Sequence, residues 1–321
     1  METFQKKKEL KKFQKQIEEN RNITINLREI VKHMPKKSHP MDVARTIVSV
    51  LGLEDKETND NSPEANMRKT IRIFAKTPTA IAAFFRARKG KNVIPPKKKL
   101  SFSENFFYMC FGKVPSKEIV KAFDVSLILY AEHSFNVSTF TARTITSSLS
   151  DIHGAITGAI ASLKGPLHGG ANEEVMHMMN KIKKPENALK WINKTLDKKE
   201  VVMGFGHRVY KKGDSRVPTM EKYFKKVSKV KSDKRFIKIY DIVKKVMIDR
   251  KNIHPNVDYP TGPTYHLMGF DTDFFTPIFV ISRITGWSAH IMEQHTANKL
   301  IRPLSKYSGP EHRKVMLLNQ R

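Results

Sequence analysis

Three short segments far apart in the chain each carry one acid-base residue beside glycine or proline: GPLHGGAN around His168, GFGHRVY around His207 and NVDYPTG around Asp258. Two histidines and a carboxylate can move protons near neutral pH. Glycine lets the backbone approach a ligand closely. A single histidine in a glycine turn could simply bond its own backbone, but three such frames together favour a catalytic site.

The elements that must position these residues are mostly helical, because apolar residues recur at three- and four-residue spacing and few segments alternate with period two. His168 precedes a helix expected from Asn172, His207 lies in a glycine turn, and Asp258 follows a turn containing proline. Such element ends can converge in a cleft. We expect helices at about residues 5–20, 41–53, 66–89, 117–149, 151–163, 172–183, 218–230, 235–251 and 273–296.

Length and composition limit the class of protein. With 321 residues, the chain can form one large domain or two ordinary ones. Cys110 is the only cysteine, which excludes an intrachain disulfide or a cysteine metal cluster and predicts a reducing, cytoplasmic location. The charged first twenty residues lack a signal peptide's apolar core. Pro277, Arg283 and His290 interrupt the longest apolar stretch, so we expect a buried helix and no membrane span.

The net charge of +28 raises the question of a nucleic-acid partner. The lysines, however, are spread along the whole sequence, and neither an aromatic RNA-binding signature nor zinc-finger spacing accompanies them. Nucleic-acid binding is therefore not the expected primary role. Two readings of the charge stay open: a solvated lysine-rich surface, or a positive field that steers small polyanionic substrates into a cleft.

The motifs together resemble a known family. GPLHGGANEEV, VVMGFGHRVYKKGDSR and NVDYPTGP are similar, in order and spacing, to the signature segments of the citrate synthase family. HPMDVARTIVSVLG, ILYAEHSFNVSTFTAR and the C-terminal run from FDTDFF to GPEHR resemble its 2-methylcitrate synthase branch. The resemblance covers most of residues 39–315.

This resemblance implies an all-α, citrate synthase-like fold of two helical domains that functions as a homodimer. Residues 1–169 and 269–321 would form the large domain, and residues 170–268 the small domain. The implied reaction condenses an acyl-CoA with oxaloacetate, with domain closure over the substrates. The coenzyme A thioester is a substrate, and neither a cofactor nor a metal is implied.

The chemistry of such a condensation assigns a role to each acid-base residue. A thioester α proton is a very weak acid, so its removal needs a base beside the carbon and a donor on the carbonyl oxygen. Asp258 suits the base and His168 the donor that stabilises the enol or enolate. His207 suits the group that polarises the ketone of oxaloacetate.

Further residues match the family's binding positions. A guanidinium binds both oxygens of a carboxylate, so Arg216 and Arg283 would clamp oxaloacetate from one chain while Arg302 reaches across the dimer. His133 and Phe279 match residues beside that substrate. The residues expected along CoA are Val201, Val202, Met203, Gly204 and Phe205.

Departures from the family pattern bear on the substrate. The sequence begins late relative to a typical member and lacks the usual YRGY segment, so we expect a shortened N-terminal part of the large domain, either through truncation of the start or because this member has lost its N-terminal elements. Pro260 and Thr261 fit the methylcitrate branch. We therefore expect propionyl-CoA to be the preferred donor, with acetyl-CoA also used. The alternatives are a citrate synthase that uses acetyl-CoA, or a non-catalytic, basic nucleic-acid-binding protein on the same fold.

Overall fold

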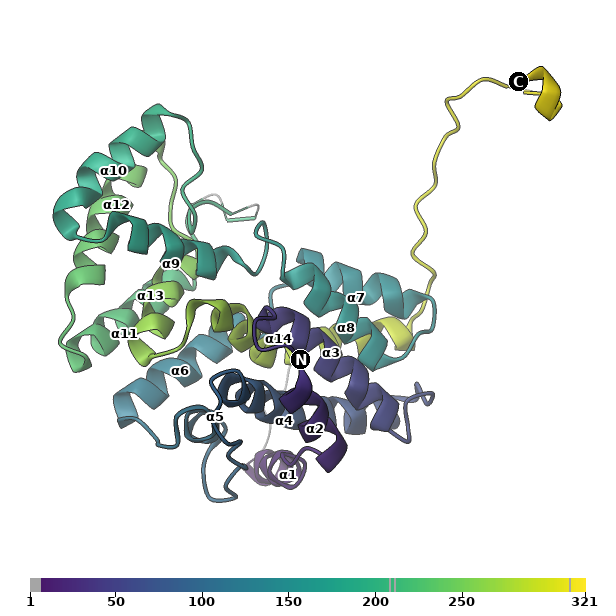
Figure 1. The fold of residues 1–321 in the computed structure, drawn as a ribbon, viewed down its shortest axis with the longest axis horizontal. Coiled ribbons are helices and arrows are strands. Elements are labelled where there is room, and N and C mark those ends of the chain that lie inside the picture. Colours follow the sequence, from purple (N-terminus) through teal and green to yellow (C-terminus); the bar gives the residue numbers. More distant parts are fainter. Residues whose placement is uncertain (1–6, 208, 211, 312) are drawn as a thin grey trace.

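The computed structural model describes residues 7–207, 209–210, 212–311 and 313–321, and these are folded mainly into α-helices (Figure 1). No strand forms within these ranges, and their one isolated antiparallel bridge joins Phe205 to Pro255. The all-α prediction is therefore confirmed. No helix found in these parts is both long and apolar enough to cross a membrane.

One group of helices surrounds the long C-terminal helix α14, Phe275–Thr296, which packs against α4, α7 and α8. Over Phe275–Ser288 nearly every residue of this helix is buried, because its sequence there is mostly apolar. Other members pack on α4 and α8 in turn. The bounds are α1 Lys7–Glu19, α2 Ile25–His33, α3 Pro40–Glu54, α4 Pro63–Ala87, α5 Phe102–Phe111, α7 Val137–Ser147 and α8 Ile152–Leu163.

A second group lies to one side of the first and comprises the helices between α8 and α14 (Figure 1). Within it α13 packs between α9 and α11, and α10 packs on α12. The bounds are α9 Ala171–Ile182, α10 Pro185–Asp197, α11 Val217–Val230, α12 Arg235–Lys251 and α13 Asp258–Met268. Helix α6, Lys117–Tyr130, contacts both α11 and α14 and so joins the groups. The exact domain boundaries stay a prediction.

The predicted helix over residues 117–149 is wrong, because the structure divides it into α6 and α7. Asn136 caps α7 by accepting a hydrogen bond from the Thr139 amide. The preceding loop is held by α14, where the Gly286 amide donates to the Ala131 carbonyl at 3.1 Å. A Cβ at Gly286 would come within 2.5 Å of that oxygen, so only glycine allows this approach.

Helices α2, α5, α10 and α13 were not predicted. Helix α13 is the instructive case, because its sequence DYPTGPTYHLM contains two prolines and a glycine. Pro260 lies in the first turn, where an amide has no intrahelical partner to lose. Gly262 is required by packing, since a Cβ there would lie 2.7 Å from the Asn172 carbonyl of α9. Tertiary packing therefore overrides the local helix-breaking signals.

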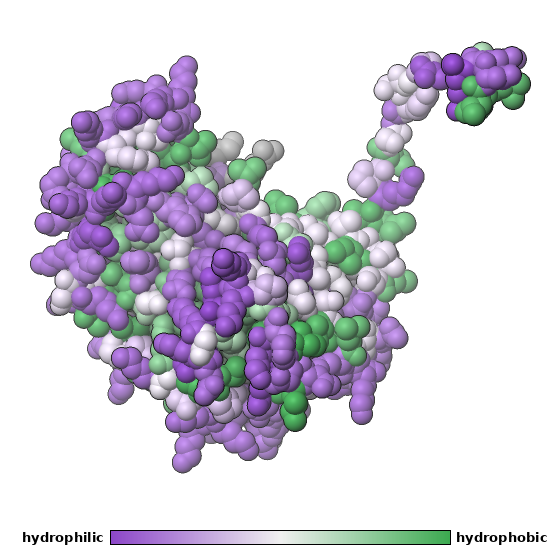
Figure 2. Space-filling model, viewed as in Figure 1, coloured by the Kyte–Doolittle hydropathy of each residue, from purple (hydrophilic) through white to green (hydrophobic). Residues whose placement is uncertain are grey.

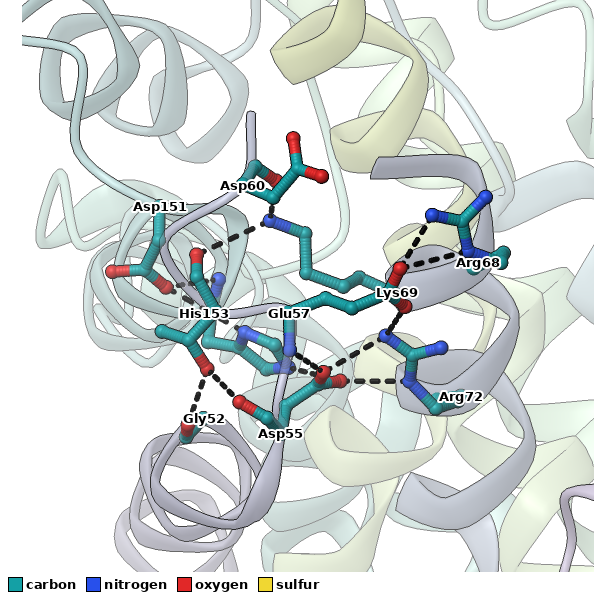
Figure 3. A network of polar contacts seen from close by, with 10 residues as sticks. Gly52, Asp55, Glu57, Asp60, Arg68, Lys69, Arg72, Asp151 and His153 are labelled. Carbon is teal, nitrogen blue, oxygen red and sulfur yellow. Dashed lines mark hydrogen bonds and ion pairs between the residues drawn. The ribbon is translucent and has the colours of Figure 1, made fainter. Parts of the chain in front are cut away.

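A buried polar cluster fixes the loop between α3 and α4 (Figure 3). Arg72 donates to both oxygens of Asp55, at 2.7 and 2.8 Å, and also to Glu57. The fully buried ammonium of Lys69 donates to the carbonyls of Thr58 and Asp60. The buried His153 lies between Asp55 and Asp151. The cluster stabilises the group of helices around α14.

Two features of the surface bear on function. The space-filling view is hollowed between the two groups of helices (Figure 2). The segment after α14 leaves the body of the molecule as an extended, exposed tail that ends in the short 3-10 helix η2, Leu318–Gln320 (Figure 1).

Candidate active site

The three acid-base frames lie where the two groups of helices meet. His168 is in the turn between α8 and α9, His207 is in the loop before α11, and Asp258 is the first residue of α13. Two aromatic side chains lie between His168 and Asp258. The ring centroid of Phe279 is 6.4 Å from that of His168 and 4.1 Å from that of Tyr130. Tyr130 in turn bonds Asp258.

Asp258 is a carboxylate tuned towards neutral pH. Burial raises its pKa to about 6, against the opposing effects of Tyr130 and Arg216, which favour the ionised form. The Tyr130 hydroxyl donates to its Oδ1 at 2.5 Å, and the Asp258 amide donates to Asn256. A base with a pKa just below neutral is ionised at pH 7 and still basic enough to accept a proton.

His168 is held as a neutral imidazole. The backbone amide of Ser138 donates to its Nε2 at 3.3 Å, and the Ser138 hydroxyl lies 2.8 Å from the same atom. Burial and the charge of Arg283 lower its pKa to about 4. With Nε2 accepting, the ring carries its proton on Nδ1, which makes that nitrogen a donor for a developing oxyanion.

His207 has the opposite tautomer. Its Nδ1 accepts from the amides of Val209 and Tyr210, at 3.1 and 3.3 Å, so the neutral ring carries its proton on Nε2. Burial and Arg216 lower its pKa. His133 lies beside it, with ring centroids 5.0 Å apart, and its own Nε2 is 3.1 Å from the Tyr210 hydroxyl. Burial lowers the pKa of His133 to about 4.

Arg283 places a buried positive charge in the site. It is fully buried on α14, and its Nε donates to the Tyr130 carbonyl at 2.6 Å. Its Nη1 is also buried but has no hydrogen-bond partner in the parts of the chain described above. Burial and the neighbouring charge of Arg216 lower its pKa to about 10. A buried cation with an unused donor implies an anionic ligand.

Arg216 faces the same space but is already paired. Its Nε and Nη2 bind the two oxygens of Asp214, at 2.9 and 2.7 Å. The buried Asp214 also accepts from the Val257 amide at 3.0 Å, which ties Arg216 to the start of α13. The pairing raises the pKa of Arg216, so its guanidinium stays charged. Its Nη1 makes only a long contact, 3.5 Å, to the Leu129 carbonyl.

The segment expected along CoA passes between α9 and α13. Gly204 has a φ of +83°, and a Cβ there would lie 2.6 Å from Val175 and 2.9 Å from Tyr259. The Gly204 carbonyl accepts from the Asn256 amide, two residues before Asp258. Val202 and Gly204 are buried, Val201 is exposed, and Met203 and Phe205 are half-buried. The segment is thus linked to the frame of Asp258.

Arg302 is not brought to this site within the chain. It is exposed and directly follows Ile301, whose amide donates to the Ser147 hydroxyl of α7. The other predicted residues, His133, Arg216, Phe279 and Arg283, do meet the three acid-base frames. No group of three metal-ligating side chains was found over the described ranges.

Sequence reasoning missed Tyr130, Ser138, Tyr210 and Asp214. Tyr130 ends a helix whose apolar pattern makes a tyrosine there read as core, and only the structure shows its hydroxyl on Asp258. Asp214 could have been found from its place two residues before Arg216. An acidic residue so close to a buried arginine is a natural partner.

The arrangement can bind an anion and move protons beside it. Arg283 and Arg216 supply positive charge, neutral His168 and His207 supply N–H donors, and Asp258 supplies a base. Such a set can abstract a proton from carbon and stabilise the negative charge on oxygen that results.

Comparisons with known proteins agree with this chemistry. Residues 2–304 match the family model described as "Citrate synthase, C-terminal domain". A Mycolicibacterium smegmatis protein named citrate synthase is 51% identical over 297 residues, which are 92% of this chain and 79% of the relative. A Mycobacterium tuberculosis protein named 2-methylcitrate synthase is 51% identical over 305 residues, or 95% of this chain and 77% of the relative.

Solved structures give the same picture. The ternary complex of carboxymethyl coenzyme A and oxaloacetate with the citrate synthase of Thermoplasma acidophilum has a TM-score of 0.91 and 30% identity. The similarity covers 99% of this chain and 86% of that one. The Pyrobaculum aerophilum citrate synthase also has a TM-score of 0.91 at 30% identity, covering 99% of this chain and 83% of that one.

Proposed function

The chain belongs to the citrate synthase family, and we propose that it is a 2-methylcitrate synthase. It condenses propionyl-CoA with oxaloacetate and hydrolyses the thioester to release 2-methylcitrate and CoA, with a side activity on acetyl-CoA. The observation that carries this proposal is the buried, unpaired Nη1 of Arg283 beside a second arginine and three histidines whose pKa values are lowered.

Oxaloacetate suits this group of side chains because it is a small dianion with a ketone. Arg283 and Arg216 bind its carboxylates, and Arg216 remains close through its bond to Asp214. His207 donates Nε2–H to the ketone oxygen, and His133 lies against it. Neutral histidines serve better than charged ones here, because a neutral donor polarises the ketone without a strong field on Asp258.

The acyl-CoA is activated between Asp258 and His168. Asp258 removes the α proton, and His168 donates Nδ1–H to the thioester oxygen as the enol or enolate forms. The nucleophilic carbon then attacks the ketone carbon, and His207 stabilises or protonates the new alkoxide. Water finally cleaves the thioester, which yields CoA and the carboxylate of the product. Each acid-base group contributes roughly 10²- to 10⁴-fold.

The choice of propionyl-CoA rests on the sequence of the chain's C-terminal third and on relatives named 2-methylcitrate synthase in M. tuberculosis and Corynebacterium glutamicum, at 51% and 50% identity. The M. smegmatis relative named citrate synthase, also 51% identical, favours acetyl-CoA as the alternative. One methylene in an apolar pocket changes the barrier by only about 1–3 kcal/mol, so we expect both donors to react.

We also propose a homodimer in which Arg302 reaches the active site of the partner subunit. The supporting observations are the extended tail that carries Arg302 and an exposed apolar surface. Phe135, Val137, Phe140 and Leu149 are exposed in and around α7. Covering such side chains is a common driving force for association.

The direct test follows thiol release from propionyl-CoA or acetyl-CoA with oxaloacetate present. We expect release with both donors, a higher kcat/KM for propionyl-CoA, and a loss of about 10²- to 10⁴-fold in Asp258→Ala. No thiol release with either donor would refute the enzyme proposal. A higher kcat/KM with acetyl-CoA would refute the preferred substrate.

A further inference from the structure

Glu173 forms a buried junction close to the turn of His168. It lies in the first turn of α9, and only 11% of its side chain is exposed. Its carboxylate bonds to residues from two other elements, His39 at the start of α3 and Thr276 at the start of α14. Glu173 has no role in the proposed reaction, so the burial of its carboxylate needs another explanation.

The bond from His39 has a defined direction. His39 is the N-cap of α3, and its Nδ1 accepts from the Met41 amide at 3.2 Å. The neutral ring therefore carries its proton on Nε2, which lies 3.3 Å from Glu173 Oε2. This bond joins α9 to α3.

Thr276 makes two bonds to the other oxygen. Its amide donates to Glu173 Oε1 at 3.2 Å, and its hydroxyl donates to the same atom. The hydroxyl also lies 3.4 Å from the carbonyl of Gly169, the residue after His168. Thr276 thus contacts both the carboxylate and the turn.

The same face of α14 continues into the active site. Thr276, Phe279 and Arg283 follow at spacings of three and four residues, so they lie on one side of the helix. Phe279 faces the ring of His168, and Arg283 carries the free donor. The bonds of Glu173 therefore fix the turn of His168 relative to the helix that carries Phe279 and Arg283.

We propose that Glu173 is a positioning residue that holds His168 in the geometry needed to stabilise the enolate, an inference that rests on the proposed function. A carboxylate accepts on both oxygens, as the three donors from His39 and Thr276 require. An amide has one accepting oxygen, so a glutamine places an N–H against at least one donor. A displacement of about 1 Å in a reacting group can reduce the rate on the order of 10²-fold.

The test compares Glu173→Gln with Glu174→Gln. Glu174 is the exposed neighbour on the same helical turn, so it controls for the loss of a negative charge near the start of α9. In Glu173→Gln we expect kcat to fall about 10- to 100-fold with little change in the KM for oxaloacetate. Glu174→Gln should match the wild type.

A binding measurement separates positioning from a purely structural role. Carboxymethyl-CoA places a carboxylate close to the CoA sulfur, in the region where the negative charge of the enolate would develop, so its affinity reports on the donors around His168. In Glu173→Gln we expect calorimetry to show a roughly 10-fold larger dissociation constant for carboxymethyl-CoA. The dissociation constant for oxaloacetate should stay within about two-fold of the wild-type value. Thr276→Val, which keeps the amide bond but loses the hydroxyl, should shift the same quantities less.

Two results would overturn the inference. One is a Glu173→Gln enzyme with the kcat and carboxymethyl-CoA affinity of Glu174→Gln. The other is a parallel loss of both ligands, with Thr276→Val unchanged, which would make Glu173 a residue of the fold alone. A wild type that releases no CoA refutes the proposed function and this inference with it, whereas an active wild type with an unaffected Glu173→Gln refutes the inference only.

Discussion

At the scale of single residues, the site depends on opposing influences upon a few ionisable groups. Burial raises the pKa of Asp258, while the hydrogen bond from Tyr130 lowers it. Burial also lowers the pKa values of His133 and His168 to about 4, so both are neutral at pH 7. The protein thus holds a carboxylate base and neutral N–H donors in the same space.

The pH dependence of activity should report on Asp258. Because the base must be ionised, kcat/KM should fall as the pH drops through about 6. Tyr130→Phe removes a donor that favours the ionised form, so the pKa of Asp258 should rise and the acidic limb should move to higher pH. The measurement is kcat/KM from pH 5 to 9. Tyr265→Phe, whose hydroxyl bonds Ser126 instead, is the control. A limb that stays in place or moves to lower pH in Tyr130→Phe would contradict this account.

Arg283 should be unfavourable for stability in the free protein and favourable for binding. Its buried guanidinium has no carboxylate partner among the residues that the structure describes, so Arg283→Met should raise the melting temperature in the absence of ligand by a few degrees. The same variant should lose the stabilisation that oxaloacetate gives the wild type. Thermal melts with and without oxaloacetate measure both effects.

The matched control is Arg250→Met, since Arg250 is an exposed residue paired with Asp197 and Asn193. It should change neither quantity measurably. An Arg283→Met protein that melts below the wild type and is still stabilised by oxaloacetate would show that Arg283 is a structural cation.

At the scale of elements, turns and helix ends present the reacting groups. The sequence predicts this for His168, His207 and Asp258, because the frames of glycine and proline are visible without a structure. It also predicts α1, α3, α4, α8, α9, α11, α12 and α14 to within a few residues. The catalytic roles themselves stay proposals.

What sequence reasoning missed depended on long-range contacts. The break between α6 and α7 follows from the approach of Gly286 to Ala131, more than 150 residues away. Helix α13 forms despite its prolines because α9 packs against Gly262. The hydrogen bond from Tyr130 to Asp258 joins residues 128 positions apart, and no local sequence pattern predicts it.

Gly204 tests whether the segment expected along CoA must pack tightly between α9 and α13. Gly204→Ala adds a Cβ where Val175 and Tyr259 already lie, at a φ of +83°. We expect a loss of roughly 1–3 kcal/mol in the free energy of unfolding and a larger rise in the KM for the acyl-CoA than in that for oxaloacetate.

The control for Gly204→Ala is Gly90→Ala. Gly90 also has a positive φ, +68°, but a Cβ there would have no neighbour within 4 Å. It should show the backbone cost alone, with both KM values unchanged. Equal effects of the two substitutions on stability and on KM would mean that the close packing of Gly204 has no role in the site.

At the scale of the whole molecule, two groups of helices surround the site, and the C-terminal tail projects from the body. The proposed homodimer gives that tail a function, because Arg302 would complete the site of the partner subunit. Steering of substrates is one of the two interpretations of the high positive charge, because both proposed substrates are anions and a positive field raises their rate of encounter.

Mixed dimers test the role of Arg302. A site in such a dimer takes Asp258 from one subunit and Arg302 from the other. Unfolding and refolding Arg302→Ala together with Asp258→Ala should therefore restore one intact site in each mixed dimer, up to about a quarter of wild-type activity. Activity no higher than the mean of the separate variants would contradict a shared site, as would a monomer in sedimentation.

The most direct test of the central claim identifies the product. The protein is incubated with oxaloacetate and equal concentrations of propionyl-CoA and acetyl-CoA. The tricarboxylate products are then separated, and mass spectrometry identifies and quantifies each one. The account predicts 2-methylcitrate as the major product with citrate as the minor one. A mixture dominated by citrate would contradict the assigned substrate, and the absence of both tricarboxylates would contradict the proposed function as a whole.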